Sequence, residues 1–118
     1  MIEQPTEITL HQQSHELEIA FEDGARYRLP YEFLRVHSPS AEVRGHGPGQ
    51  EVLQVGKQGV NVVSVEPVGS YAMKITFDDG HDSGLYTWEY LYNLGKRKDA
   101  LWQDYLQRLE AAGKSRVL

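Results

Sequence analysis

Residues 77–91 read Phe77-Asp-Asp-Gly-His-Asp-Ser-Gly-Leu-Tyr-Thr-Trp-Glu-Tyr-Leu91. This stretch contains the end of a strand, a tight turn, a lone histidine and the start of an aromatic helix. The Asp-Gly pair at positions 79 and 80 supplies the positive φ angles that a two-residue hairpin turn requires. The stretch therefore predicts a strand, a turn, a second strand and a helix, and it concentrates in one place the side chains that could act at a surface.

The same pattern occurs earlier in the chain. Residues 19–24, Ile-Ala-Phe-Glu-Asp-Gly, correspond to residues 75–80, Ile-Thr-Phe-Asp-Asp-Gly. Each is followed by a short extended run and an aromatic segment, at 31–34 and at 88–91. We interpret this as two units of strand, turn, strand and short helix. A duplication and a chance similarity both remain open, because Asp-Gly between alternating strands is common in β proteins.

The remaining segments complete the prediction of an α+β fold, mostly antiparallel β-sheet hairpins with a C-terminal helical segment. Strands are expected where apolar and polar residues alternate, at 6–11, 16–21, 25–29, 60–65 and 71–77, with a turn at 67–70. Pro30 suits the first position of a short helix over 31–35. Thr87 can cap a helix over 88–94, Gly95 ends or bends it, and a second helix runs from Asp99 to Gly113.

Composition limits the function classes. The 118 residues are expected to form a single domain over 1–118, and the net charge of −5 argues against nucleic acid as a partner. There is no cysteine, no signal-like amino terminus and no apolar run near the roughly 20 residues of a membrane helix. We therefore expect a soluble, cytoplasmic protein that does not bind membranes. The basic run at 96–98 is either a solvated helix start or a docking patch for an acidic partner.

Two further segments have alternative interpretations. The glycine-rich residues 44–59 predict a mobile surface loop, because they lack the spacing, the lysine and the following helix of a phosphate-binding loop. Apolar and aromatic residues recur at helical spacing through Trp102 and Tyr105. They are expected to pack against a sheet, or else to form a partner or homodimer surface.

No catalytic residue is predicted from local pattern. Ser38 or Ser40 beside His37 or His81 could be imagined as a dyad, but no nucleophile elbow or oxyanion donor accompanies them. Ser38 precedes a proline and is more simply the cap of a single helical turn. Adjacent aspartates at 78 and 79 should point to opposite sides of a strand end, which makes them a poor acid and base pair.

Residues 34–47, which begin Leu-Arg-Val-His-Ser-Pro-Ser, together with residues 77–91 resemble the N-terminal domain of gamma-butyrobetaine hydroxylase and its relatives, a domain of unknown function. The likeness extends over residues 6–94, and residues 95–118 form the C-terminal helix beyond it. In the hydroxylases the domain is similar to a small β-rich module that holds a structural zinc through three cysteines and a histidine. The resemblance implies no dioxygenase activity, because a separate, larger domain carries that chemistry.

Carried over by position, the zinc cysteines correspond to Ser38, Ser40 and Val43, and the histidine corresponds to His81. A hydroxyl that stays protonated and a valine without a donor atom cannot make the thiolate site that zinc prefers. We therefore expect no metal and no cofactor. The alternative is a metal-binding protein or metal-dependent enzyme that holds zinc or iron through His37, His46, His81 and Asp82.

The resemblance implies a stand-alone, non-catalytic accessory or protein-interaction module. Family members are fused to dioxygenases of carnitine synthesis and to ATPases that carry iron–sulfur clusters, so the expected partner is a metalloenzyme or an iron–sulfur carrier. The expected binding surface lies on residues 38–46 and 81–88. The residues expected to bind the partner are Arg35, His37, Ser38, Ser40, His46 and Trp88, of which Arg35 and His37 come just before the first of these ranges. A structural homodimer is the further alternative.

Overall fold

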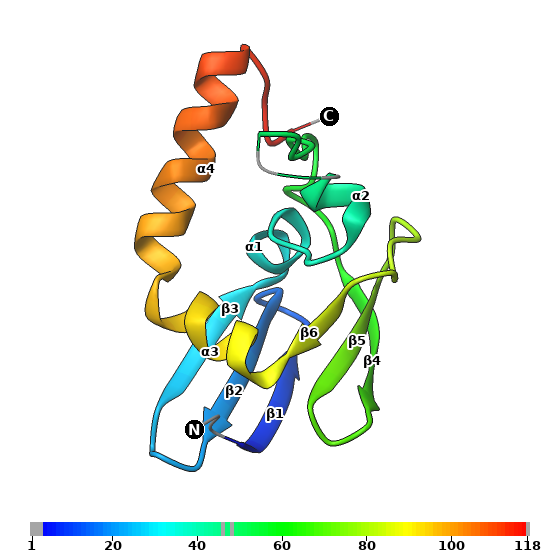
Figure 1. Ribbon diagram of the computed structural model, residues 1–118, viewed down its shortest axis with the longest axis vertical. Helices are drawn as coiled ribbons and strands as arrows, with labels where there is room; N and C mark the ends of the chain where they lie inside the picture. The colour runs from blue at the N-terminus through cyan, green and yellow to red at the C-terminus, as the bar shows by residue number, and fades with distance from the viewer. Residues whose placement is uncertain (1–3, 46, 48, 118) are drawn as a thin grey trace.

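The computed structural model describes residues 4–45, 47 and 49–117 (Figure 1). The elements in chain order are β1 (Pro5–His11), β2 (Glu16–Phe21), β3 (Arg26–Pro30), α1 (Tyr31–Val36), α2 (Ala41–Arg44), β4 (Val62–Val68), β5 (Ala72–Phe77), β6 (Leu85–Thr87), α3 (Trp88–Lys96) and α4 (Lys98–Ala112). None of the described helices is long and apolar enough to cross a membrane.

The strands form two antiparallel sheets of three strands each, in the orders β1-β2-β3 and β4-β5-β6. Each sheet is followed directly by a helix, α1 after the first and α3 after the second. The glycines of the two Asp-Gly turns, Gly24 and Gly80, both have the positive φ that the sequence requires. The predicted α+β fold of hairpins with C-terminal helices is therefore confirmed, as is the repeated order of strand, strand and helix.

One apolar core joins the two sheets. The buried face of β2 contributes Leu17, Ile19 and Phe21, and the buried face of β5 contributes Met73 and Ile75, all at most 2% exposed. The alternation of strand side chains sends these residues to one face, and α1 and α3 cover it with further buried residues. This shared core fixes the connections at the helical end of the sheets, where the candidate site lies.

Helix α4 packs partly against α1 and partly against the main core. Its inward residues Tyr105 and Leu109 form a separate small cluster with Val36 of α1. Leu101 and Trp102 of the same stripe pack against the main core, and α4 lies beside α1 (Figure 1). Tyr105 is 1% exposed within the chain, so its ring is already covered before any second copy binds.

Two predicted boundaries were wrong. The turn predicted at 67–70 begins later, because β4 continues through Val68 and Pro67 pairs with Met73. Proline is tolerated there since β4 is an edge strand and needs no outward N–H group. Gly95 does not end α3 but lies within it, where a Cβ atom would come within 2.3 Å of the Tyr27 ring. This glycine allows a helix to approach an aromatic ring closely.

The starts of two helices also differ from the prediction. Thr87 caps α3 as predicted, since its hydroxyl accepts a hydrogen bond from the Tyr90 N–H at 3.1 Å. The cap of α2, however, is Ser40 and not Ser38. Pro30 is likewise the residue before α1 and not its first position. The hydroxyl of Ser38 is therefore free for a different contact.

Candidate functional site

Two segments far apart in the chain meet beside α2. Ser38 follows α1, Ser40 caps α2, and His81 and Ser83 lie in the connection between β5 and β6. Ser38 Oγ lies 2.8 Å from His81 Nε2, and Ser40 Oγ lies 2.7 Å from Ser83 Oγ. We call these four residues the clasp. It joins the two halves of the chain through paired side chains that are 43 positions apart.

The hydrogen bonds of the clasp define where its protons lie. His81 Nδ1 is 3.2 Å from a carboxylate oxygen of Glu42, which can only accept a hydrogen bond when ionised. His81 therefore donates a hydrogen bond from its Nδ1–H to Glu42 and accepts a hydrogen bond from the Ser38 hydroxyl at Nε2. The Ser38 oxygen in turn accepts from the Ser40 N–H at 3.2 Å.

Burial lowers the pKa of His81, and the nearby guanidinium of Arg35 lowers it further, against the opposing effect of Glu42. The neutral imidazole is thus the form that this environment favours. It is also the form that the hydrogen bonds of the clasp require.

The order Ser38, His81, Glu42 has the connectivity of a hydrolytic triad, but it is closed to substrate. Ser38 is 1% exposed and His81 is 6% exposed. Gly84 lies directly over the hydroxyl, since a Cβ atom added there would be 2.4 Å from Ser38 Oγ. A nucleophile must reach the carbonyl carbon that it attacks. In this arrangement the Ser38 hydroxyl is covered, and the clasp connects the two segments.

An ion-pair network supports the clasp from one side. Arg35 is 7% exposed, and its Nε donates to Asp79 at 2.9 Å while Lys57 Nζ donates to the same oxygen at 2.6 Å. The other oxygen of Asp79 accepts from the His81 N–H at 3.1 Å. Burial would raise the pKa of Asp79, but the hydrogen bonds from Lys57, His81 and Arg35 outweigh it and lower the pKa to about 2. This carboxylate stays ionised and fixes the turn that carries His81.

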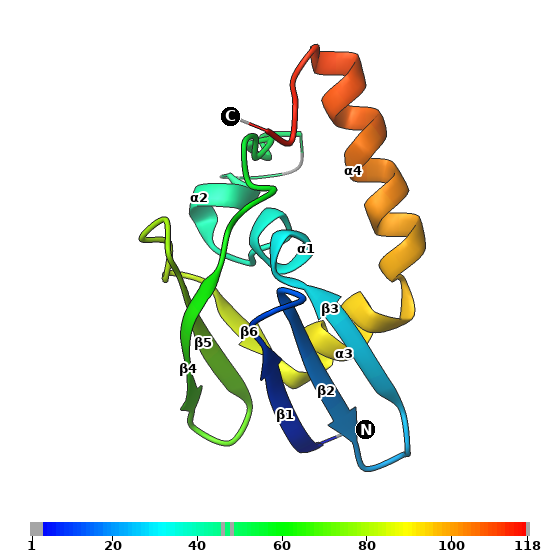
Figure 2. The same ribbon diagram turned by 180° about the vertical axis from the view of Figure 1, so that it is seen from behind.

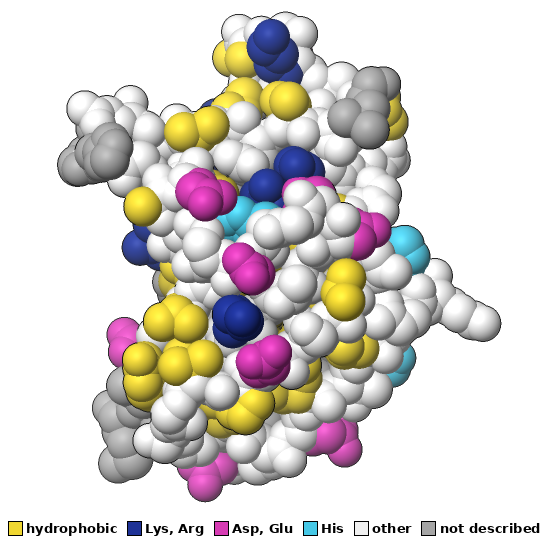
Figure 3. All heavy atoms as spheres, turned by 90° about the vertical axis from the view of Figure 1, so that its right-hand side faces the viewer, with side chains coloured by type: hydrophobic (Ala, Val, Ile, Leu, Met, Phe, Trp, Pro, Cys, Tyr) yellow, Lys and Arg dark blue, Asp and Glu magenta, His cyan; other side chains and the backbone are white. Residues whose placement is uncertain are grey.

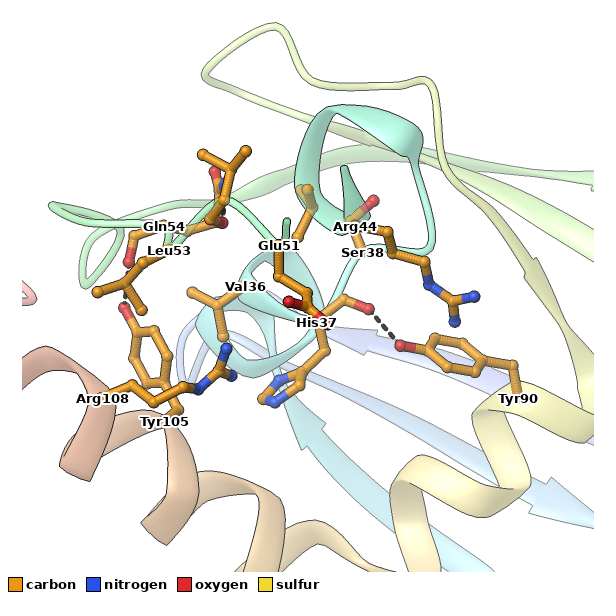
Figure 4. Close-up of a pocket in the computed structure, with 12 residues that line it drawn as sticks. Val36, His37, Ser38, Arg44, Glu51, Leu53, Gln54, Tyr90, Tyr105 and Arg108 are labelled. Atoms are coloured by element: carbon orange, nitrogen blue, oxygen red, sulfur yellow. Dashed lines mark hydrogen bonds between the residues drawn. The ribbon is translucent and has the colours of Figure 1, made fainter. Parts of the chain in front are cut away.

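His37 lies in a different environment, against a cavity of about 110 Å³ beside α4 (Figure 4). Its Nδ1 is 2.9 Å from the Phe33 carbonyl, so Nδ1 carries the proton. Its Nε2 is buried and has no hydrogen-bond partner among the described residues. The Tyr90 hydroxyl donates to the His37 carbonyl at 2.6 Å. Burial lowers the pKa of His37, which keeps this imidazole neutral.

The predicted surface residues are mostly covered. Arg35, Ser38, Ser40 and Trp88 are each at most 7% exposed, and the Trp88 Nε1 donates to the Ser70 carbonyl at 2.9 Å. His46 lies outside the described residues. The exposed residues of the same two segments include the clasp residue Ser83 and its neighbours Glu42, Arg44, Asp82 and Leu85.

The residues of the alternative metal site have different partners. His37 packs against Phe33, with ring centroids 4.6 Å apart, whereas His81 contacts Ser38 and Glu42. Asp82 is exposed. Within the described part of the chain, no three His, Asp or Glu side chains are close enough to hold an ion.

Sequence reasoning did not single out Ser83, which completes the clasp, or Glu42 and Lys57, which support it. No sequence motif marks these three residues. Glu42 lies in a short helix, and Ser83 and Lys57 lie in loops. Gly84 carried the one readable signal, because a glycine beside the lone histidine indicates a close approach of another segment.

Comparison with known proteins gives the chain a family. Residues 8–92 match the family described as gamma-butyrobetaine hydroxylase-like, N-terminal. The chain belongs to this family. The match contains all four clasp residues and both sheets, so the resemblance seen in the sequence is confirmed over most of the chain.

Solved structures of family-like domains agree with the fold. A protein solved in solution by NMR is 58% identical, with a TM-score of 0.85 over 98% of this chain and 91% of that one. A second NMR structure is 49% identical, with a TM-score of 0.84 over 97% and 85% of the two chains. A crystal structure from Acidithiobacillus ferrooxidans, a protein of unknown function in the DUF971 family, is 41% identical. It gives a TM-score of 0.66 over 78% of this chain and 92% of that one. No curated protein matches the chain.

The gamma-butyrobetaine hydroxylase-like resemblance implied zinc ligands at four positions, and three of them are clasp residues. Val43, the fourth, is 7% exposed in α2. The donor set is two hydroxyls and one imidazole whose lone pair already accepts from Ser38. These residues do not fit a zinc ion, which prefers deprotonated sulfur or free imidazole nitrogen. In this family member, hydrogen bonds hold together the segments that carry those positions.

Proposed function

We propose that this domain is a non-catalytic accessory module that docks onto a protein partner, a metalloenzyme or an iron–sulfur carrier. The observation that carries the proposal is a set of exposed apolar side chains on the second sheet and its turn, of which Leu85 lies two residues after the clasp residue Ser83. Exposed apolar side chains of the second sheet and its turn, Val63, Tyr71 and Leu85, are 63%, 54% and 43% exposed. A patch that combines apolar residues with a polar rim is typical of a protein interface.

The charged part of this surface adjoins the apolar part. In Figure 1, α2 and the β5–β6 connection lie on the right, and Figure 3 faces that side. Figure 3 shows a histidine surrounded by acidic and basic side chains in the upper half, and apolar side chains gathered below it. Charges arranged beside an apolar centre favour specificity and orientation of binding.

The clasp supports this role by holding the surface in place. Glu42 belongs to α2 and contacts His81, whose turn leads into Leu85. The two segments that form the surface are therefore joined by side-chain hydrogen bonds before any partner arrives. A preformed surface loses less conformational entropy on binding.

The class of partner rests on the family. Related domains are fused to dioxygenases and to ATPases that carry iron–sulfur clusters, so a metal-bearing protein is the partner class that the resemblance supports. This chain has no cysteine and so brings no thiolate ligand of its own. Its contribution would be recognition and not cluster ligation.

The test is capture from native lysate with immobilised protein, followed by binding of the captured protein in purified form. Leu85→Glu should reduce the affinity of the purified partner at least tenfold, and Ala111→Glu on the exposed side of α4 is the matched control. The proposal fails if both variants bind equally or if the captured proteins contain no metalloprotein. Recovery of this chain alone, with a dimer in light scattering, would favour the homodimer.

A further inference from the structure

The segment after α4 turns back and lies against the loop that follows α2 (Figures 1 and 2). Gly113 ends α4 in the left-handed conformation, with φ of 66°. The carbonyls of Ser115 and Arg116 then accept hydrogen bonds from Gly56 and Gln58 at 3.1 and 3.0 Å. We call residues 115–117 the strap.

The side chain of Arg116 is held by a site that matches a guanidinium group. Its Nε and Nη2 donate to the two carboxylate oxygens of Glu32 at 2.9 and 2.7 Å. Glu32 belongs to α1 and is only 7% exposed. The hydrogen bonding between Arg116 and Glu32 raises the pKa of the Arg116 guanidinium. A two-point pairing of this kind selects arginine over lysine, because only guanidinium presents two parallel donors.

The ring of Trp102 completes the site. The Cζ atom of Arg116 lies 5.1 Å from the centroid of that ring, within the range of a cation–π contact. A buried carboxylate, an aromatic face and two backbone N–H donors together form a binding site for one arginine and the two carbonyls beside it, on a chain that bends at that arginine. We call this the arginine seat, made by Glu32, Trp102, Gly56 and Gln58.

Space remains on both sides of Arg116. A cavity of about 230 Å³ lies towards α4 and is lined by Phe33, Trp102 and Arg116 among others. Another of about 500 Å³ lies towards the loop and is lined by Lys57, Asp78 and Val117 among others. The residues that flank an arginine in a longer peptide would therefore have room in the seat.

We propose that the arginine seat is a second recognition site, which binds an arginine-containing segment of a partner protein and which the strap occupies within the same chain. The strap shows the chemistry that the seat accepts. Because a tethered segment has an effective concentration on the order of millimolar, the strap competes with any external peptide. Release of the strap would therefore control access. This site is separate from the surface proposed above, so either proposal can fail alone.

The test uses the full chain with Arg116→Ala, which removes the guanidinium from Glu32 and Trp102 and so weakens the hold of the strap on the seat. The probe is a capped peptide with the sequence of residues 113–118, and the matched control peptide replaces its arginine by citrulline, a neutral group of the same shape. Calorimetry should show binding of the arginine peptide to the Arg116→Ala chain at least tenfold tighter than to the wild type. The citrulline peptide should bind at least tenfold more weakly to that variant.

Two further variants keep the test decisive. Arg116→Lys retains a positive charge beside Glu32 while losing the two-point pairing, and it should also bind the arginine peptide more tightly than the wild type does. Glu32→Gln combined with Arg116→Ala should lose this binding. Equal binding of both peptides, equal binding to wild type and variants, or no binding to either Arg116 variant would overturn the proposal.

Discussion

Ser38 Oγ and His81 Nε2 lie 2.8 Å apart in a place where neither side chain is more than 6% exposed. This one hydrogen bond connects the end of α1 to the turn after β5. It lies at positions that, by the resemblance, correspond to the zinc ligands of the hydroxylases. It therefore gives a direct way to test whether packing and hydrogen bonding replace the ion in this chain.

Ser38→Ala should destabilise the domain by about 1–3 kcal/mol, because it leaves the buried Nε2 of His81 without a partner. The Ser40 N–H would lose its acceptor at the same time. Urea unfolding followed by fluorescence measures the change, with the exposed Ser70→Ala as the control. An unchanged midpoint for Ser38→Ala would show that the hydrogen bond contributes nothing to stability.

Restoring cysteines at 38, 40 and 43 should create a metal site with His81, if the positions correspond as the resemblance implies. Cobalt added to the triple variant should give the absorption bands of tetrahedral thiolate coordination, and zinc should displace it. The wild type should give no such bands. A triple variant that binds no cobalt, while remaining folded by circular dichroism, would contradict the correspondence.

Asp79 should make stability depend on pH in the acidic range. Its folded pKa of about 2 is below the ordinary 3.8, so the folded state binds its proton less readily than the unfolded chain. The resulting stability, roughly 2 kcal/mol, is fully present above pH 4 and is lost as pH falls towards 2. The difference in unfolding free energy between wild type and Asp79→Asn should shrink over that interval. A constant difference from pH 7 to 2 would show that protonation of Asp79 does not control stability.

Gly95→Ala should destabilise the domain by about 1–3 kcal/mol although alanine favours helix, because its Cβ would overlap the ring of Tyr27. Thermal unfolding measures the loss. Tyr27→Ala provides the test of cause, since in that background Gly95→Ala should be neutral or stabilising. A similar loss in both backgrounds would point to the helix itself.

Much of the fold could be predicted from local pattern. The alternation in β2 and β5 and the Asp-Gly turns decide their conformation within a few residues, so period and turn chemistry were sufficient. Pro67 and Gly95 misled because their effect depends on tertiary context. The edge strand β4 tolerates Pro67, and the Tyr27 ring on β3 lies so close to α3 that only a glycine fits at position 95.

The candidate site was only partly predictable for the same reason. The family resemblance indicated Ser38, Ser40 and His81, which the fold brings together. Their partners Glu42 and Ser83 belong to no motif, since a hydrogen bond between distant side chains leaves no periodic signal in the sequence. The sequence also did not indicate which of these side chains are buried. Most residues of the predicted binding surface are covered in the structure, and their neighbours are exposed.

The pairing of strands only with their chain neighbours has a consequence for how the molecule assembles. Each three-stranded sheet can form by closing short loops, which carries a small entropic cost and favours rapid folding. Contacts between residues 38 and 81 must wait until both halves exist. In kinetic experiments we therefore expect substitutions there to accelerate unfolding while leaving the folding rate nearly unchanged.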